Sequence, residues 1–242
     1  MRRIVLFGLT LLVAAACLGL GVWQLRRLTG KRSANREALA QRTLPWLVTG
    51  QSPTLGLVPN RRARLTGELD EAREFLLRGR LIQGVPAVVV ITPLRVSGSD
   101  TAVLINRGYV PAPDAVDPGA ASWSEPGQVA FHGVLLAVPS RGDGAPLRHG
   151  GRETWKSLDL PAMRARLPYP IDANYLVAES DSGSDDAHTV RGKVYPFRAE
   201  PPPLDEGPHL MYAIQWFGIA GAVAAFGIIF VWRGGPKRAL SG

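Results

Sequence analysis

The chain begins with an apolar run, IVLFGLTLLVAAACLGLGVW, which occupies residues 4–23 and contains no charged side chain. At about 1.5 Å per helical residue, a run of roughly twenty residues matches the ~30 Å hydrocarbon core of a bilayer. A second uncharged run, residues 210–232, lies near the other end of the 242-residue chain. The two runs predict two transmembrane helices, and the polar segment between them is long enough for one globular domain.

The residues around Cys17 offer another interpretation of the first run. Alanines at 14–16 precede this single cysteine and resemble the small-residue cleavage site of a signal peptide. Apolar residues nevertheless continue beyond Cys17 as far as Trp23, which favours a retained span over a cleaved signal or a lipidated cysteine. One cysteine also excludes a disulfide framework or a Cys-based metal cluster within one chain.

The net charge of +8 is concentrated beside the apolar runs. Residues 1–42 carry eight Lys or Arg and one acidic residue, Glu37, and residues 233–242 carry three basic residues and no acidic one. The remaining segment has a net charge of −2. The basic excess therefore indicates contact with the headgroups of the lipid bilayer, and no nucleic-acid partner is expected.

Charge in the short tails predicts the orientation of the chain. Basic residues at 2–3 and 233–238 place both termini in the cytoplasm and the domain outside, because a long loop largely escapes the positive-inside rule. The basic cluster at residues 26–36 argues for the opposite orientation. Since the first run leaves no room for a transit peptide, the expected location is the bacterial plasma (inner) membrane.

Strand-like runs bounded by turn residues fill the segment between the spans. We expect strands at residues 61–69, 74–81, 87–96, 102–110, 129–138 and 171–179, and one short helix at 157–167. The pattern predicts a membrane protein of the α+β class, with two transmembrane helices flanking one mainly antiparallel β extracytoplasmic domain. The predicted domains are residues 1–25, the tail and first span; 26–208, the outer domain with a basic first helix and a Pro-rich tether; and 209–242, the second span and basic tail.

The sequence contains no motif typical of a catalytic site. We find no nucleophile elbow, phosphate-binding glycine loop, paired metal histidines or haem-attachment cysteines, so we expect no enzyme activity. The acidic stretch at 179–188 lacks the ligand alternation of a calcium loop and is better interpreted as a solvated turn.

The second apolar run begins with polar side chains. His209, Tyr212 and Trp216 share one helical stripe at i, i+3 and i+7. Tyr and Trp are ordinary at a membrane interface, whereas an ionisable residue at the edge of a span is a candidate functional group. Residue type alone leaves two roles for His209 open, ligation of haem iron or a metal, and interfacial hydrogen bonding.

Arg107 lies inside VLINRGYVP, residues 103–111. Strand alternation would place it on the same face as Val103, Ile105 and Tyr109, where a guanidinium group needs a partner. An arginine bonded to a carboxylate or to turn carbonyls is favoured, because buried charges are usually paired for architecture. Contact with an anionic ligand or a partner protein is the functional alternative.

Small residues recur at four-residue spacing in both spans. Such pairs permit close approach of helix backbones, so they predict that the spans pack on each other or on helices of a partner. The pairs are Ala15 with Gly19, Gly218 with Ala222, and Gly221 with Ala225.

The order of these motifs resembles the surfeit-locus-one family of cytochrome oxidase assembly factors, and the resemblance covers nearly the whole chain. The motifs are LGLGVWQLRRLTGK at 18–31, RLTGELDEAREFLLRGR at 64–80, VVVITPLRV at 88–96, VLINRGYVP at 103–111, the W-x-x-L-D-L-P-A-M segment at 155–163, YPIDANYL at 169–176 and GPHLMYAIQWFGIA at 207–220.

The resemblance implies a site at the second span. His209 matches the histidine that the family's motif associates with haem binding, and Tyr212 and Trp216 belong to the same motif. Trp23 and Gln24 match the first-span motif, and the resemblance implies that they join the cofactor site. Arg107, Gly108 and Tyr109 match an Arg-Gly-aromatic motif of structural or partner-binding character. The family often has Asn two positions before the histidine, where this chain has Gly207.

The resemblance implies a non-enzymatic assembly factor for haem-copper cytochrome c oxidase. The factor would assist delivery or insertion of haem a into the catalytic subunit, or stabilise that subunit, together with other assembly factors. The alternative is a membrane scaffold that binds oxidase subunits without binding haem. A membrane-anchored hydrolase is a third class, for which the sequence offers no residues.

Overall fold

The computed structural model describes residues 2–48, 55–119, 123–142, 145–149, 152–180, 196–198 and 200–232. The chain forms two compact units, which we describe separately. One comprises residues 1–37 and 204–242, and the other comprises residues 38–203. Most of the acidic stretch at 179–188, the C-terminal basic tail and the side chains at residues 2–3 lie outside the description, so the predictions that rest on them stay predictions.

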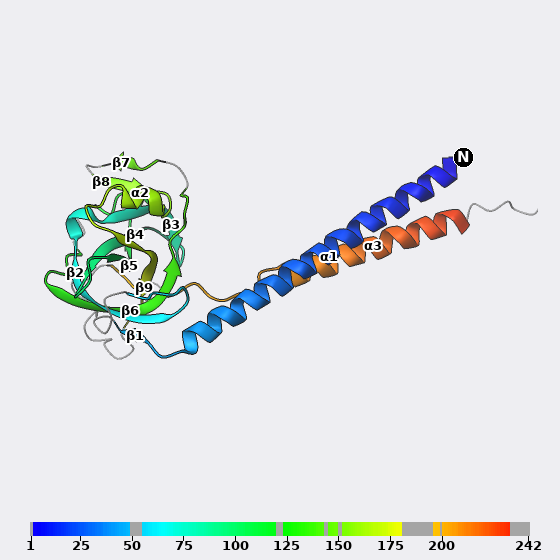
Figure 1. Ribbon diagram of the computed structural model, residues 1–242. Coiled ribbons are helices and arrows are strands. Elements are labelled where there is room, and N and C mark those ends of the chain that lie inside the picture. Colours follow the sequence, from blue (N-terminus) through cyan, green and yellow to red (C-terminus); the bar gives the residue numbers. More distant parts are fainter. Residues whose placement is uncertain are drawn as a thin grey trace, which may run out of the picture. The chain divides into compact units, whose positions relative to one another are not determined.

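Two antiparallel helices form the first unit (Figure 1). Helix α1 runs from Arg2 to Thr43 and helix α3 from His209 to Trp232. Both are long and apolar enough to cross a membrane. The basic helix expected after the first span is a direct continuation of α1, which ends before Pro45 because a residue preceding proline disfavours helical geometry.

The unit boundaries differ from the predicted domain boundaries. The predicted divisions fall after residues 25 and 208, whereas packing divides the chain after residues 37 and 203. Contacts between α1 and the residues before α3 continue past the apolar runs and explain the difference. The level at which the chain leaves the membrane stays a prediction.

Residues at seven-residue spacing bury the seam of the helix pair. Ala213, Ala220 and Gly227 are buried on α3. The buried positions within residues 4–37 of α1 are Ala14, Cys17, Gly21, Gln24 and Leu28. Alternating steps of three and four residues give the 3.5-residue period of helices that wind around each other with a left-handed twist.

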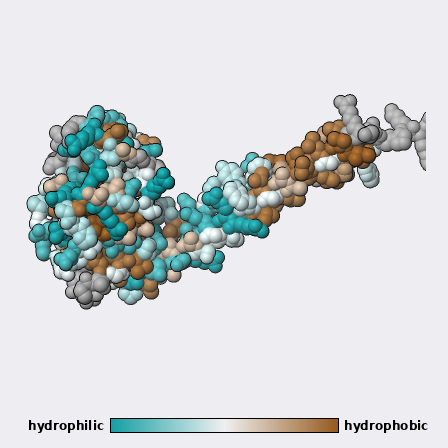
Figure 2. All heavy atoms as spheres, turned by 45° about the horizontal axis from the view of Figure 1, so that its top comes forward, coloured by the Kyte–Doolittle hydropathy of each residue, from teal (hydrophilic) through white to brown (hydrophobic). Residues whose placement is uncertain are grey.

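The four-residue small pairs do not form this seam. All six residues are exposed, and a Cβ added at Gly19, Gly218 or Gly221 would meet no atom within 4 Å. The two helices do pack on each other, but through the seven-residue set. Figure 2 shows the right-hand part of the pair covered by hydrophobic side chains and its remaining turns by mostly hydrophilic ones.

The described residues of the second unit form a nine-stranded β domain. Its strands are β1 (Leu47–Val48), β2 (Arg62–Leu69), β3 (Phe75–Ile82), β4 (Val85–Val96), β5 (Ala102–Pro111), β6 (Gln128–Ala137), β7 (Leu147–His149), β8 (Arg152–Trp155) and β9 (Ile171–Ala178). A 3-10 helix, η1, spans Glu71–Arg73, and helix α2 spans Leu160–Arg164. The six predicted strands are confirmed as β2 to β6 and β9, each within two residues at both ends.

Helix α2 is shorter than the predicted helix at 157–167. The Asp159 side chain caps its first turn by accepting a hydrogen bond of 3.0 Å from the Ala162 N–H. A backbone N–H donor bonded in this way holds the pKa of Asp159 below its usual range, and the Gly142 N–H adds to the effect. Residues before the cap therefore lie outside the helix.

The strand order is β1-β2-β6-β9-β5-β4-β3-β8-β7, with an added pairing of β2 with β4. That pairing closes β2, β6, β9, β5 and β4 into a five-stranded barrel, from which β3, β8 and β7 extend. Most pairs are antiparallel, but β9 lies parallel to β5. The sequence thus predicts the mainly antiparallel class correctly.

Strand β4 is the central strand of the domain. Its residues 87–94 are buried without interruption, as the unbroken apolar run predicts. Leu94 packs in the cluster formed by the closed strands, Val89 and Ile91 pack in a second cluster that includes Met163 of α2, and Val90 belongs to a third. Strand β4 is thus buried on both faces, and β5, which carries the Arg-Gly-Tyr motif, pairs directly with it.

Candidate functional site

His209 is the first residue of α3, directly after a tight turn. Gly207 has a φ of +67°, in the left-handed region that glycine adopts freely and that Asn adopts more readily than most residues. Tyr212 N–H donates to the Pro208 carbonyl at 3.1 Å and continues the turn into the helix. Glycine at position 207 therefore suits the backbone conformation that leads to His209.

The imidazole of His209 contacts Gln24 of α1. His209 Nδ1 lies 2.9 Å from Gln24 Oε1, with the histidine half-buried and Gln24 only 9% exposed. A carbonyl oxygen only accepts, so this contact is a hydrogen bond when Nδ1 carries the proton, and the Nε2 lone pair is then available to a hydrogen-bond donor or a metal ion. Gln24 therefore supplies a contact that orients the His209 ring.

Polar contacts further along α1 fix the segment that precedes α3. The Arg32 guanidinium pairs with Glu206 through two bonds, Nε to Oε1 and Nη2 to Oε2, both of 2.8 Å. The same pairing holds the pKa of Glu206 below its usual range. Asn35 Nδ2 donates to the carbonyls of Leu204 and Asp205 at 3.1 and 2.8 Å. These contacts set the register that brings His209 opposite Gln24.

The structure places the other predicted cofactor residues differently. Trp23 is 48% exposed, with the Arg27 guanidinium 5.2 Å from its ring centre. Tyr212 is 46% exposed, and Trp216 is half-buried. Of the five predicted positions, a direct contact joins His209 and Gln24, whereas Trp23 and Tyr212 present aromatic surface away from the packed seam.

Arg107 lies at a β-bulge in β5. Ile91 pairs with Asn106 and the preceding Val90 pairs with Gly108, so Arg107 is the extra residue between them. The bulge shifts the alternation of the strand, and Tyr109 packs on a different cluster from Ile105. The prediction that Arg107 shares one face with both residues is therefore wrong.

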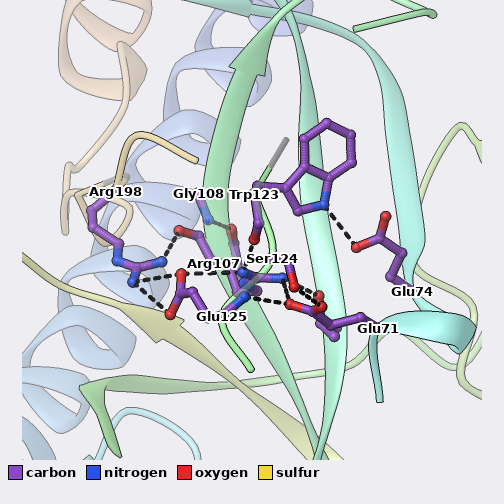
Figure 3. A network of polar contacts seen from close by, with 10 residues as sticks. Glu71, Glu74, Arg107, Gly108, Trp123, Ser124, Glu125 and Arg198 are labelled. Atoms are coloured by element: carbon purple, nitrogen blue, oxygen red, sulfur yellow. Dashed lines mark hydrogen bonds and ion pairs between the residues drawn. The ribbon is translucent and has the colours of Figure 1, made fainter. Parts of the chain in front are cut away.

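The Arg107 side chain is fully buried in a network of polar groups (Figure 3). Its Nη1 lies 3.4 Å from Glu71 Oε1 and from Thr92 Oγ1. Its Nη2 lies 3.1 Å from Glu125 Oε1 and donates to the Trp123 carbonyl. Two carboxylates and a backbone carbonyl surround one guanidinium, as expected for a charge paired for architecture.

The carboxylate of Glu71 extends this network to the loop before β6. It accepts hydrogen bonds from Ser124 Oγ at 2.5 Å and from the Glu125 N–H at 2.7 Å. Trp123 Nε1 donates to Glu74 Oε2 at 2.9 Å (Figure 3). Burial raises the pKa of Glu74, and the Trp123 hydrogen bond opposes that rise only in part. The network fastens the loop onto β4, β5 and η1.

Gly108 and Tyr109 hold a second segment. Tyr109 and Phe197 exchange two backbone hydrogen bonds of 2.8 Å, and a Cβ added at Gly108 would lie 2.0 Å from the Phe197 carbonyl oxygen. Arg198 donates to the Arg107 carbonyl at 2.7 Å and pairs with Glu125 at 3.2 Å (Figure 3). The Arg-Gly-Tyr motif therefore holds two chain segments. The Arg107 side chain binds the loop at 123–125, whereas Gly108 leaves room for Phe197 and the Tyr109 backbone pairs with it.

Most of this network could not be predicted from the sequence. Glu71, Glu125 and Arg198 come from separate segments, and each belongs to a residue type that is common on surfaces. The one available signal was the predicted place of Arg107 on an apolar strand face. A guanidinium there needs a polar partner, but the sequence does not show which residue that partner is. Among the described residues, no group of three or more His, Cys, Asp or Glu could hold a metal ion.

Comparison with known proteins identifies the class. A profile of the SURF1 family matches residues 11–221, which include both spans' motifs and the whole β domain. The chain belongs to the SURF1 family, the surfeit-locus-one family of cytochrome oxidase assembly factors that its motifs resemble.

Relatives from distant organisms match over almost the same length. A SURF1-like protein of Monosiga brevicollis is 26% identical, with 97% of this chain and 91% of the relative covered. Human surfeit locus protein 1 is 25% identical over 93% of this chain and 77% of its own length. A SURF1-like protein of Rickettsia felis is 23% identical over 94% of this chain and 95% of its own length. These matches place the two helices and the β domain in one family architecture.

Proposed function

We propose that this chain is a non-enzymatic assembly factor for haem-copper cytochrome c oxidase that assists delivery or insertion of haem a, or stabilises the catalytic subunit. Membership of the SURF1 family supports the oxidase role. The observation that carries the haem proposal is the contact of His209 with Gln24. A neutral imidazole held at one nitrogen by an acceptor presents the other nitrogen as an iron ligand.

The residues at this site fit a haem group. His209 would hold the iron through Nε2, and a Cβ built on Gly207 would lie 3.6 Å from that nitrogen, so the absence of a side chain there leaves space beside it. Trp23 and Tyr212 offer exposed aromatic surface of the kind that packs against a flat macrocycle. When bound, haem would supply an iron that takes an imidazole ligand, and this chain would supply the ligand and its orientation.

We place the protein in the bacterial plasma membrane with both termini in the cytoplasm and the β domain outside. The basic residues of the short tails support this orientation. In that topology His209 lies at the outer edge of the bilayer. Haem would then be held where an apolar macrocycle meets the headgroup region, close to partners that are themselves embedded in the membrane.

The experiment is purification of the full chain from cells that make haem a. We expect bound haem in the wild type and loss of most of it in His209→Ala, with a changed absorption spectrum of the remainder. Absence of haem from the wild type, or an unchanged content and spectrum in the variant, would refute ligation by His209. A deletion strain with normal oxidase haem content and no second family member would refute the wider role.

The second candidate is a scaffold that binds oxidase subunits without haem. The exposed small residues on both helices favour it, since Gly19 and Gly218 stand open to approach by helices of another protein. Co-purification of the catalytic subunit with His209→Ala, at the same yield as with the wild type and with no haem in either preparation, would select this function.

A further inference from the structure

We propose that Gln24 is a positioning residue, which holds His209 in the Nδ1–H tautomer and so determines that Nε2 is the nitrogen offered to a ligand. This inference rests on the proposed function for its consequence, but its physical claim concerns the protein without haem. It assigns to Gln24 a role distinct from direct contact with the cofactor.

The geometry shows which atoms meet. Nδ1 of His209 lies 2.9 Å from the side-chain oxygen of Gln24, a normal hydrogen-bond length for a nitrogen donor and an oxygen acceptor. The amide oxygen has no proton to donate, so the imidazole must carry its own proton on Nδ1. The other ring nitrogen is then the unprotonated one, which is the form required of a metal ligand.

The surroundings of Gln24 explain why an amide stands there. Gln24 lies in the buried seam of α1, between the buried residues Gly21 and Leu28, and its neighbours in the seam are apolar or small. An amide buried in such a seam destabilises the helix pair unless it is hydrogen-bonded. The His209 ring satisfies the oxygen, and in return the buried, confined oxygen fixes the orientation of the ring.

Polar contacts hold the segment that leads to this pairing. Arg32 with Glu206, and Asn35 with the carbonyls of Leu204 and Asp205, hold the chain directly before α3 onto α1. His209 therefore meets Gln24 without a free loop between them. A metal ligand whose second nitrogen is held by an outer acceptor typically loses 10- to 100-fold in metal affinity when that acceptor is removed.

The first measurement is the tautomer of His209 in the full chain without haem, by ¹⁵N NMR of histidine-labelled protein in detergent micelles. His209→Ala identifies the signal by its disappearance. We expect Nδ1 protonated and Nε2 unprotonated in the wild type and in Gln24→Glu, which keeps an acceptor. In Gln24→Met, of similar volume but without one, we expect a mixture of tautomers. A wild type protonated on Nε2, or a Gln24→Met signal identical to it, overturns the proposal.

The second measurement is haem affinity, with a matched control in the same seam. Gln24→Met should bind haem 10- to 100-fold more weakly than the wild type, whereas Leu28→Met, which introduces the same side chain one helical turn away, should bind normally. Gln24→Glu should retain binding and lower the reduction potential of the bound haem, because a carboxylate makes the imidazole a more basic ligand. Equal affinities for all four proteins overturn the proposal.

The two measurements separate the failure of the inference from the failure of the proposed function. If the wild type binds no haem, the proposed function fails, while the tautomer experiment still decides the role of Gln24. If the wild type binds haem through His209 but Gln24→Met changes neither tautomer nor affinity, the function stands and Gln24 is only an interhelical hydrogen-bond partner.

Discussion

Arg107 of the β domain and His209 of the helix pair are both motif residues, but their surroundings differ in one respect. The Arg107 side chain is 0% exposed and meets two carboxylates, a hydroxyl and a backbone carbonyl. His209 is half-buried and has a described hydrogen bond on one ring nitrogen, to Gln24.

The contrast separates architecture from binding. A guanidinium enclosed on both terminal nitrogens has little left to offer a ligand. Removing it would take the shared cation away from Glu71 and Glu125, which lie about 30% exposed and keep their contacts to Ser124 and Arg198. A half-exposed imidazole with one nitrogen held keeps the chemistry of the other. Motif membership alone would have given both residues the same weight.

Truncation of Arg107 is the strongest test of this contrast. Arg107→Met should destabilise the β domain by about 3–5 kcal/mol, because Glu71 and Glu125 lose their shared cation. Arg107→Lys should restore little, since one ammonium cannot replace two separated nitrogens. Denaturant unfolding of the full chain, followed by tryptophan fluorescence, measures the loss.

The matched control for this test is Arg64→Met, an exposed arginine on β2, for which a change within about 0.5 kcal/mol is expected. If Arg107→Met were as stable as this control, the network would not be architectural. Contact of Arg107 with an anionic ligand or partner would then become the better interpretation.

Gly108 allows a test of the second contact made by the Arg-Gly-Tyr motif, the one with Phe197. Gly108→Ala combines a φ of +120° with a Cβ placed 2.0 Å from the Phe197 carbonyl oxygen, and we expect a loss of about 3 kcal/mol or more. Gly98 also has a positive φ, +77°, but its added Cβ meets no atom within 4 Å, so Gly98→Ala should cost about 1 kcal/mol. Equal losses of unfolding free energy would mean that Phe197 is not seated on Gly108.

The buried carboxylate of Glu74 should give the smallest effect. Burial raises the pKa of Glu74 in the folded protein. Its contribution to the free energy of unfolding is therefore fully present below the unfolded pKa of about 4.3 and is lost as pH rises through the folded pKa. Glu74→Gln, which keeps an acceptor for Trp123, should therefore raise the melting temperature at pH 7.5, and the gain should shrink toward pH 4. Thermal unfolding at both pH values measures it.

The control for this pH dependence is Glu68→Gln, on the exposed face of β2, whose melting temperature should follow the wild type at both pH values. A gain in Glu74→Gln that stays constant with pH would show that the carboxylate is not destabilised by burial.

Much of the fold follows from sequence because it depends on local patterns. Two apolar runs and regularly spaced turn residues predicted the helices, the six main strands and the mainly antiparallel class. Strands β1, β7 and β8 were missed, since each has four residues or fewer and too short a pattern to detect. The β5 bulge was missed because it depends on the pairing with β4, which no single strand records.

The contact between His209 and Gln24 could not be predicted from the sequence. Small residues occur at both four- and seven-residue spacing, and only the position of the partner helix selects the second set. His209 and Gln24 were identified separately, because they belong to two family-like motifs at opposite ends of the chain. Their contact depends on the register set by Arg32, Glu206 and Asn35, none of which belongs to a recognised binding pattern.

The place of β9 in the barrel governs the order in which the domain can be completed during synthesis. β5 and β6 follow each other in sequence, yet β9 lies between them and pairs with both. Until residues 171–178 emerge, each of those strands has an unpaired edge, which is a template for incorrect pairing and aggregation. Closure of the barrel therefore waits for β9, the last of its strands along the chain.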